Sequence, residues 1–104
     1  MSVLYLYEGK AKELLEDICN LAGHTIEEVK SKSRKHKLVM LRATFSVICT
    51  EQFPDLPVLF IAGLINRGTQ ILYWNYPMLI DKDLEVREYY LRMKSLLNLL
   101  IKEE

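Results

Sequence analysis

The sequence predicts an all-α protein, a bundle of five or six helices that contains a helix-turn-helix. Apolar residues recur at helical intervals of three and four in several segments, and no segment alternates in the manner of paired strands. Residues that begin or end helices separate these segments by short connections. The 104 residues suffice for one modest core, so we expect a single domain over residues 1–104.

The first predicted helix covers residues 10–22 and ends at Gly23, which favours a helix terminus. The preceding stretch "SVLYLY" has β-propensity but no partner strand, so we expect an irregular arm or the lead-in to this helix. The apolar residues at helical spacing are Leu14, Leu15, Ile18, Leu21 and Ala22.

A capping box and a long helix come next. In "TIEE", Thr25 caps a short helix and Glu28 reaches back to the capping residue. A basic stretch connects it to a helix expected from about His36 to Gln52, which Pro54 ends. Its apolar side is expected to consist of Leu38, Leu41, Phe45, Ile48, Cys49 and either Gln52 or Phe53.

Two shorter helices follow. Asp55 is placed to cap a helix over residues 57–63, with Pro57 in its first turn. After a turn at residues 64–66, another helix begins near residues 67–69 and should end before Pro77. A tight pair of helices behind a longer support helix is the pattern of a helix-turn-helix.

The C-terminal helix is predicted over residues 81–103 and opens at Asp81 and Asp83. Further apolar residues lie outside its main stripe, which allows a homodimer through this helix. The main stripe comprises Leu84, Tyr90, Met93, Leu97 and Leu100, and the additional apolar residues are Val86, Tyr89, Leu96, Leu99 and Ile101.

Charge is balanced overall but unevenly distributed. Fourteen basic residues match fourteen acidic ones, yet no acid occurs from Val29 to Thr50. A neutral protein with this distribution can still present one basic face to a nucleic acid. The clustered cations are Lys30, Lys32, Arg34, Lys35, Lys37 and Arg42.

Cys19 and Cys49 are the only cysteines, thirty positions apart, and we interpret them as buried free thiols in a reducing compartment. His24 and His36 lack carboxylates or cysteines at ligand spacing, so we expect no metal, and His36 would add to the basic stretch when protonated. No signal peptide is recognisable, and the apolar stretch at residues 58–65 is too short to cross a bilayer. We therefore expect a cytoplasmic protein without a membrane partner.

Residues 18–76 resemble the C-terminal DNA-binding domain of the bacterial replication initiator DnaA. The matching features are the basic "SKSRK", the Leu56-Pro57 that starts a helix, its spacing to Asn66, and the "ILYW" that follows. The resemblance implies a Trp-repressor-like helical fold with a helix-turn-helix. It implies double-stranded DNA as partner, in replication initiation or its regulation.

The resemblance also assigns roles to individual residues. Arg34 would enter the minor groove, where narrow A·T-rich DNA concentrates negative potential. Arg42 matches a basic residue near the phosphate backbone, and the recognition helix would place its first residues against base edges. The expected DNA-binding residues are Lys32, Arg34, Lys35, Lys37 and Arg42, with Arg67, Gly68, Thr69 and Gln70 on the recognition helix.

The recognition helix departs from the family. Where the family has Arg-Asp-His-Thr-Thr, this chain has Asn66-Arg67-Gly68-Thr69-Gln70, which retains only the first threonine. An arginine suits guanine and a glutamine suits adenine, so we expect a different target from the family's usual box. Alternatively, Asn66 and Gly68 only form an ordinary helix start. In either case, we expect Trp74 to anchor this helix onto the support helix.

No phosphate-cradling glycine loop occurs, so we expect no nucleotide, no cofactor and no ATPase. Because no catalytic grouping is recognisable either, we expect a protein that is not an enzyme. Two functions remain: a double-stranded DNA-binding protein, or a degenerate DnaA-like fold that acts as a protein-protein interaction module.

Overall fold

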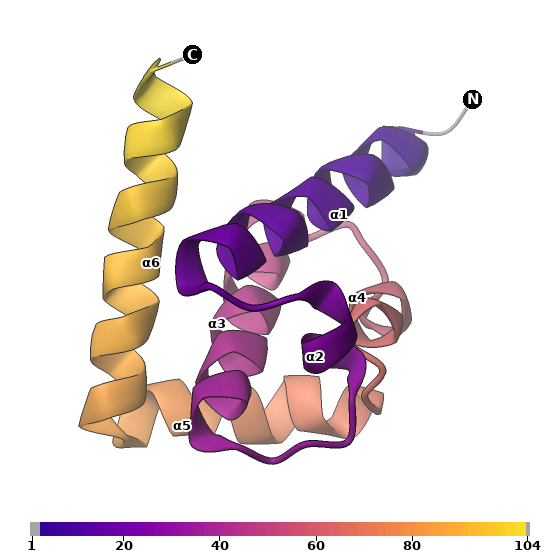
Figure 1. Ribbon diagram of the computed structural model, residues 1–104. Helices are drawn as coiled ribbons and strands as arrows, with labels where there is room; N and C mark the ends of the chain where they lie inside the picture. The colour runs from indigo at the N-terminus through magenta and orange to yellow at the C-terminus, as the bar shows by residue number, and fades with distance from the viewer. Residues whose placement is uncertain (1–2, 104) are drawn as a thin grey trace.

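The computed structural model describes the backbone of residues 3–103 and the side chains of residues 5–98. This part of the chain contains helices and no strand, so the all-α prediction is confirmed (Figure 1). The elements are α1 (Val3–Ala22), α2 (Ile26–Lys30), α3 (His36–Gln52), α4 (Val58–Leu64), the π-helical turn η1 (Ile71–Asn75), α5 (Tyr76–Lys82) and α6 (Leu84–Glu103).

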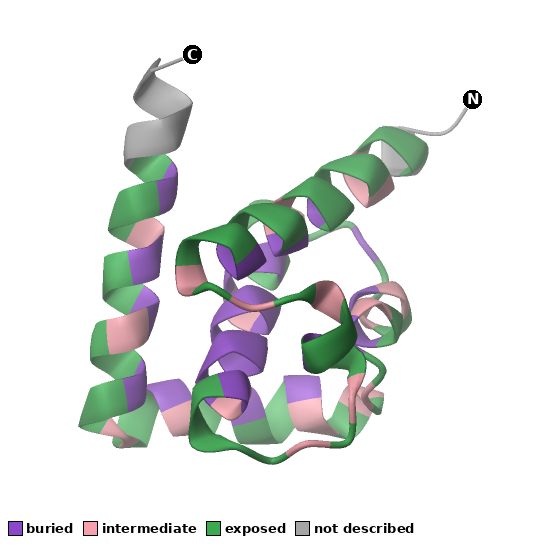
Figure 2. Cartoon of the chain, viewed as in Figure 1, coloured by how far each residue is buried: buried purple, intermediate pink, exposed green. Residues whose placement is uncertain are grey.

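Helix α3 is the centre of the fold and contacts all the other helices. Figure 1 shows α1 crossing α3 on one side, α5 running across its N-terminal end, and α6 standing alongside. Ten of the seventeen residues of α3 are buried, on more than one side of the helix, as the purple bands of Figure 2 show. The prediction of a single apolar side was therefore too narrow. Of the two alternatives for its last residue, Phe53 packs against the core and Gln52 lies exposed.

Three predicted helix caps or ends are confirmed, whereas Asp81, expected to open the last helix together with Asp83, belongs to α5 instead. The amide of Glu28 donates to Thr25 Oγ1 at 3.1 Å and the amide of Thr25 donates to Glu28 Oε1 at 2.9 Å, which completes the capping box. Gly23 ends α1 with a φ of 76°. Asp83 Oδ1 accepts from the amides of Glu85 and Val86 at 3.0 and 3.2 Å and so caps α6.

Two predicted features were wrong. The N-terminal stretch is no irregular arm, because α1 begins at Val3 and Tyr7 packs against Phe53 with ring centroids 5.8 Å apart. The helix expected to end before Pro77 continues to Lys82: residues 69–82 are helical without a break through η1 and α5. We call this stretch helix 69–82.

The π-helical turn explains how Pro77 is accommodated. The amide of Tyr76 donates to the carbonyl of Ile71, five residues back, which interrupts the α-helical register just before the proline. Pro77 then lies in the first turn of α5, directly after this change of register.

The C-terminal helix packs along a narrower stripe than predicted. Tyr90, Met93 and Leu97 are buried as expected, and Val86 belongs to this stripe rather than to a second face. Leu84 is 65 % exposed, because it opens the helix at the edge of the fold. The side chains of Leu99, Leu100 and Ile101 lie outside the described residues.

Candidate nucleic-acid interface

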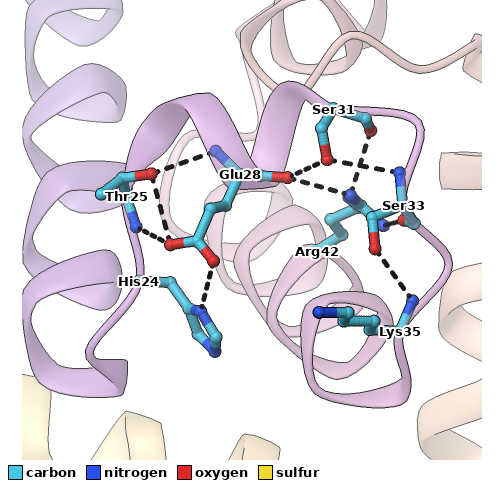
Figure 3. A network of polar contacts seen from close by, with 7 residues as sticks. All are labelled: His24, Thr25, Glu28, Ser31, Ser33, Lys35 and Arg42. Carbon is cyan, nitrogen blue, oxygen red and sulfur yellow. Dashed lines mark hydrogen bonds and ion pairs between the residues drawn. The ribbon is translucent and has the colours of Figure 1, made fainter.

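The stretch from Ser31 to Lys37, here called the basic segment, links α2 to α3 and is shaped by serine side chains. Ser31 Oγ donates to the carbonyl of Glu28 at 2.6 Å and accepts from the amide of Ser33 at 3.3 Å. Ser33 Oγ in turn accepts from the amide of Lys35 at 3.3 Å (Figure 3). These turns direct the side chains of Lys32, Arg34, Lys35 and Lys37 into solvent, and all four are exposed.

Arg42 holds the basic segment from inside the protein. Its Nε donates to the carbonyl of Val29 at 2.7 Å and its Nη1 to that of Ser33 at 2.7 Å. Its Nη2 donates to the carbonyls of Ser31 at 3.1 Å and Glu28 at 3.3 Å. Since Arg42 is 1 % exposed and its donors point at carbonyls, the expected contact with the phosphate backbone is corrected: Arg42 orders the segment instead.

Arg67 ties the same segment to the turn that precedes helix 69–82. Its Nη2 donates to the carbonyl of Ser31 at 2.8 Å, the carbonyl that Arg42 also uses, and its Nη1 donates to that of Asn66 at 3.0 Å. Asn66, with a φ of 55°, donates from Nδ2 to the carbonyl of Lys30 at 3.2 Å. In this conformation the half-buried Arg67 guanidinium braces the backbone rather than projecting as a base reader does.

The two guanidiniums concentrate positive charge at this junction. Burial, and secondly the charge of Arg67, lower the pKa of Arg42 below its ordinary value. The acceptors of Arg42 are all backbone carbonyls, which leave its charge unneutralised. An anion placed nearby would therefore be attracted to both arginines.

An open groove of about 1310 Å³ runs between the basic segment and helix 69–82. Among the residues that line the groove, Asp83 is the acidic one, and its carboxylate already accepts hydrogen bonds from the amides at the start of α6. The groove is therefore strongly electropositive for a protein without net charge. The basic residues that line it are Lys32, Arg34, Arg42, Arg67 and Lys82.

The remaining predicted residues lie at the start of helix 69–82. Gly68 and Gln70 are exposed and Thr69 is half-buried. Trp74, expected as an anchor onto α3, is instead 69 % exposed, so that prediction was wrong. The side of the helix that carries Leu72 and Tyr76 packs on the core instead.

Two further polar residues lie beside the predicted set: Lys82 lines the groove, and Asn66 donates to the carbonyl of Lys30. Lys82 was missed because the helix that begins near residue 69 was expected to end before Pro77, which would have placed Lys82 in a different helix. His36 does not simply extend the cationic surface: its Nε2 lies 2.7 Å from Glu85 Oε1 on α6, an acid that offsets its charge when protonated.

Comparisons with known proteins do not place the chain in a family: no protein-family model, curated protein or solved structure matches it. Within the described residues, no helix is both long and apolar enough to cross a membrane.

Proposed function

We propose that this chain binds double-stranded DNA. The observation that carries the proposal is the bracing of a cationic segment against the start of helix 69–82 by Arg42 and Arg67. Exposed Lys32, Arg34 and Lys35 would lie on the phosphate backbone and minor groove, and helix 69–82 would enter the major groove.

Preorganisation supports this reading over that of an ordinary solvated loop. A solvated lysine-rich loop needs no fixed backbone, whereas here hydrogen bonds from two arginines and three serine or asparagine side chains fix it. A fixed loop loses less conformational entropy when it binds. The arrangement of α4, the turn at residues 65–68 and helix 69–82 suits a helix-turn-helix, in which α4 supports the recognition helix.

The resemblance to the DNA-binding domain of DnaA supports the same proposal and suggests a role in replication initiation or its regulation. Because the residues at the start of helix 69–82 differ from the family's base readers, the target would differ from the family's box. Two duplexes test both points: one with that box and one scrambled, compared by fluorescence anisotropy over a salt series. If the protein contacts phosphates, log affinity should fall linearly with log salt, with a slope of about 0.9 for each phosphate neutralised.

The variants for this experiment change charge by equal amounts on two surfaces. The binding variant replaces Lys32, Arg34 and Lys35 with alanine. Its control replaces Lys10, Lys12 and Arg92, which are also exposed, on α1 and α6. Loss of binding only in the first supports the proposal. Equal losses, or no binding by the unmodified chain at low salt, contradict it.

A second candidate function is a protein-protein interaction module. It is favoured by leucines in solvent on α6, where Leu84 and Leu91 are 65 % and 55 % exposed. A homodimer through this helix would cover them. Sedimentation at high micromolar concentration tests it: a dimer that Leu91→Asp dissociates supports the module, and a monomer excludes this homodimer.

A further inference from the structure

Helix 69–82 carries large apolar side chains that the fold leaves in solvent. Trp74 is 69 % exposed, Tyr73 is 59 % exposed and Met78 is 52 % exposed. Gln70, Trp74 and Met78 follow one another at intervals of four, so they lie in one row along the helix. We call Gln70, Tyr73, Trp74 and Met78 the outer face of this helix.

The surroundings of the outer face indicate what covers it. Met78 and Asn75 line the same groove as Lys32, Arg34 and Lys82, so the apolar row borders a cationic surface. A duplex matches both features of this surface, because its major groove exposes thymine methyl groups between two rows of phosphates. Tyr73 and Trp74 also lie within η1, and π-helical turns occur frequently at functional sites.

We infer that the outer face reads A·T base pairs in the major groove, with Trp74 and Met78 against thymine methyl groups. This inference rests on the proposed function. The C5-methyl of thymine is the apolar group that bases expose in the major groove, and it matches an apolar side chain. Gln70, in the same row, offers the amide that pairs with N6 and N7 of adenine.

The experiment uses the full chain with an alternating A·T duplex and the same duplex with uracil in place of every thymine. The substitution removes only the methyl groups. Binding to labelled duplex is measured by anisotropy, and emission from Trp74, the only tryptophan, reports its environment. We expect Trp74 to be shielded from a soluble quencher on binding. We also expect affinity to fall about fourfold for each methyl group that Trp74 or Met78 covers in the thymine duplex, the equivalent of one buried methylene-sized group.

Two variants locate the effect. Trp74→Ala should bind the thymine duplex more weakly and discriminate less between thymine and uracil; because Trp74 is mostly exposed, the variant should fold normally. Leu91→Ala removes an exposed leucine from α6 and should leave both affinities unchanged.

Other outcomes overturn the inference in distinguishable ways. Equal affinity for both duplexes with unshielded Trp74 removes the base-reading role and leaves the proposed function intact. Tighter binding to single-stranded DNA, with Trp74 shielded, would mean that Trp74 stacks on bases and does not contact thymine methyl groups. Shielding that rises with protein concentration without DNA assigns the face to a second copy. No binding to either duplex at low salt overturns the proposed function itself.

Discussion

At the scale of single residues, the two arginines show why a basic pattern does not separate contact from support. Arg34 and Arg42 both belong to the same cationic cluster, yet Arg34 is exposed and Arg42 is 1 % exposed. The burial of Arg42 depends on carbonyls at residues 28–33 that converge only when α2 and α3 pack together. Sequence spacing alone carries no information on that convergence.

Replacing Arg42 with lysine keeps the charge but removes the fork that reaches several carbonyls at once. We expect Arg42→Lys to lower the free energy of unfolding by about 2–3 kcal/mol, because buried acceptors lose their donors. Arg34→Lys is the matched control and should change it by less than about 0.5 kcal/mol. Urea unfolding of both variants measures this, and equal stability of the two would refute the bracing role of Arg42.

The buried thiols make stability sensitive to alkaline pH. Burial raises the pKa of Cys19 to about 11 and that of Cys49 to about 12, from 9.0 in the unfolded chain. Below pH 9 both states keep the thiol protons; above it the unfolded chain loses them first. The free energy of unfolding should therefore fall by up to about 1.4 kcal/mol per pH unit for each thiol between pH 9 and 11. Urea unfolding at pH 9 and 10 should give a smaller decline for Cys49→Ala than for the unmodified chain.

At the scale of elements, local signals located several helix ends correctly but not all: Asp55 does not cap α4, whose N-cap is Pro57 and which has no side-chain cap. Helix α3 begins at His36 and ends at Gln52 as predicted, and the capping box of α2 and the aspartate cap of α6 are formed. Helix 69–82 was misjudged because a π-helical turn absorbs the proline, and packing of Leu72 and Tyr76 on the core accompanies that turn. Such tertiary support has no short-range signature.

The capping box of α2 allows a test of whether this short helix orders the basic segment that follows it. Helix α2 has five residues, too few for stability by itself, so its cap matters. We expect Thr25→Ala to cost about 1 kcal/mol of folding free energy and to speed amide hydrogen exchange in the basic segment. Thr25→Ser retains a capping hydroxyl and should restore most of both. If amide hydrogen exchange in the basic segment is unchanged in Thr25→Ala, the cap does not order that segment.

At the scale of the whole molecule, a net charge of zero conceals a separation of charge. Basic residues line the groove between the basic segment and helix 69–82, whereas no acid lies in residues 30–50 to offset them. The global balance excluded neither DNA nor protein as a partner. The sequence indicated the basic surface, and only the fold joined it to Lys82 and to the outer face of helix 69–82.

The salt dependence of binding separates residues that contact phosphates from those that position them. If DNA lies on the basic segment, Arg34→Ala should reduce the slope of log affinity against log salt by about 0.9, because one fewer counterion is released. Arg42→Gln, which removes the charge, should weaken binding without changing that slope, since a buried side chain that meets carbonyls neutralises no phosphate. Anisotropy titrations at several salt concentrations give both slopes. A reduced slope for Arg42→Gln would mean that Arg42 leaves its carbonyls to contact the DNA phosphates, and the braced segment would then be a feature of the free protein alone.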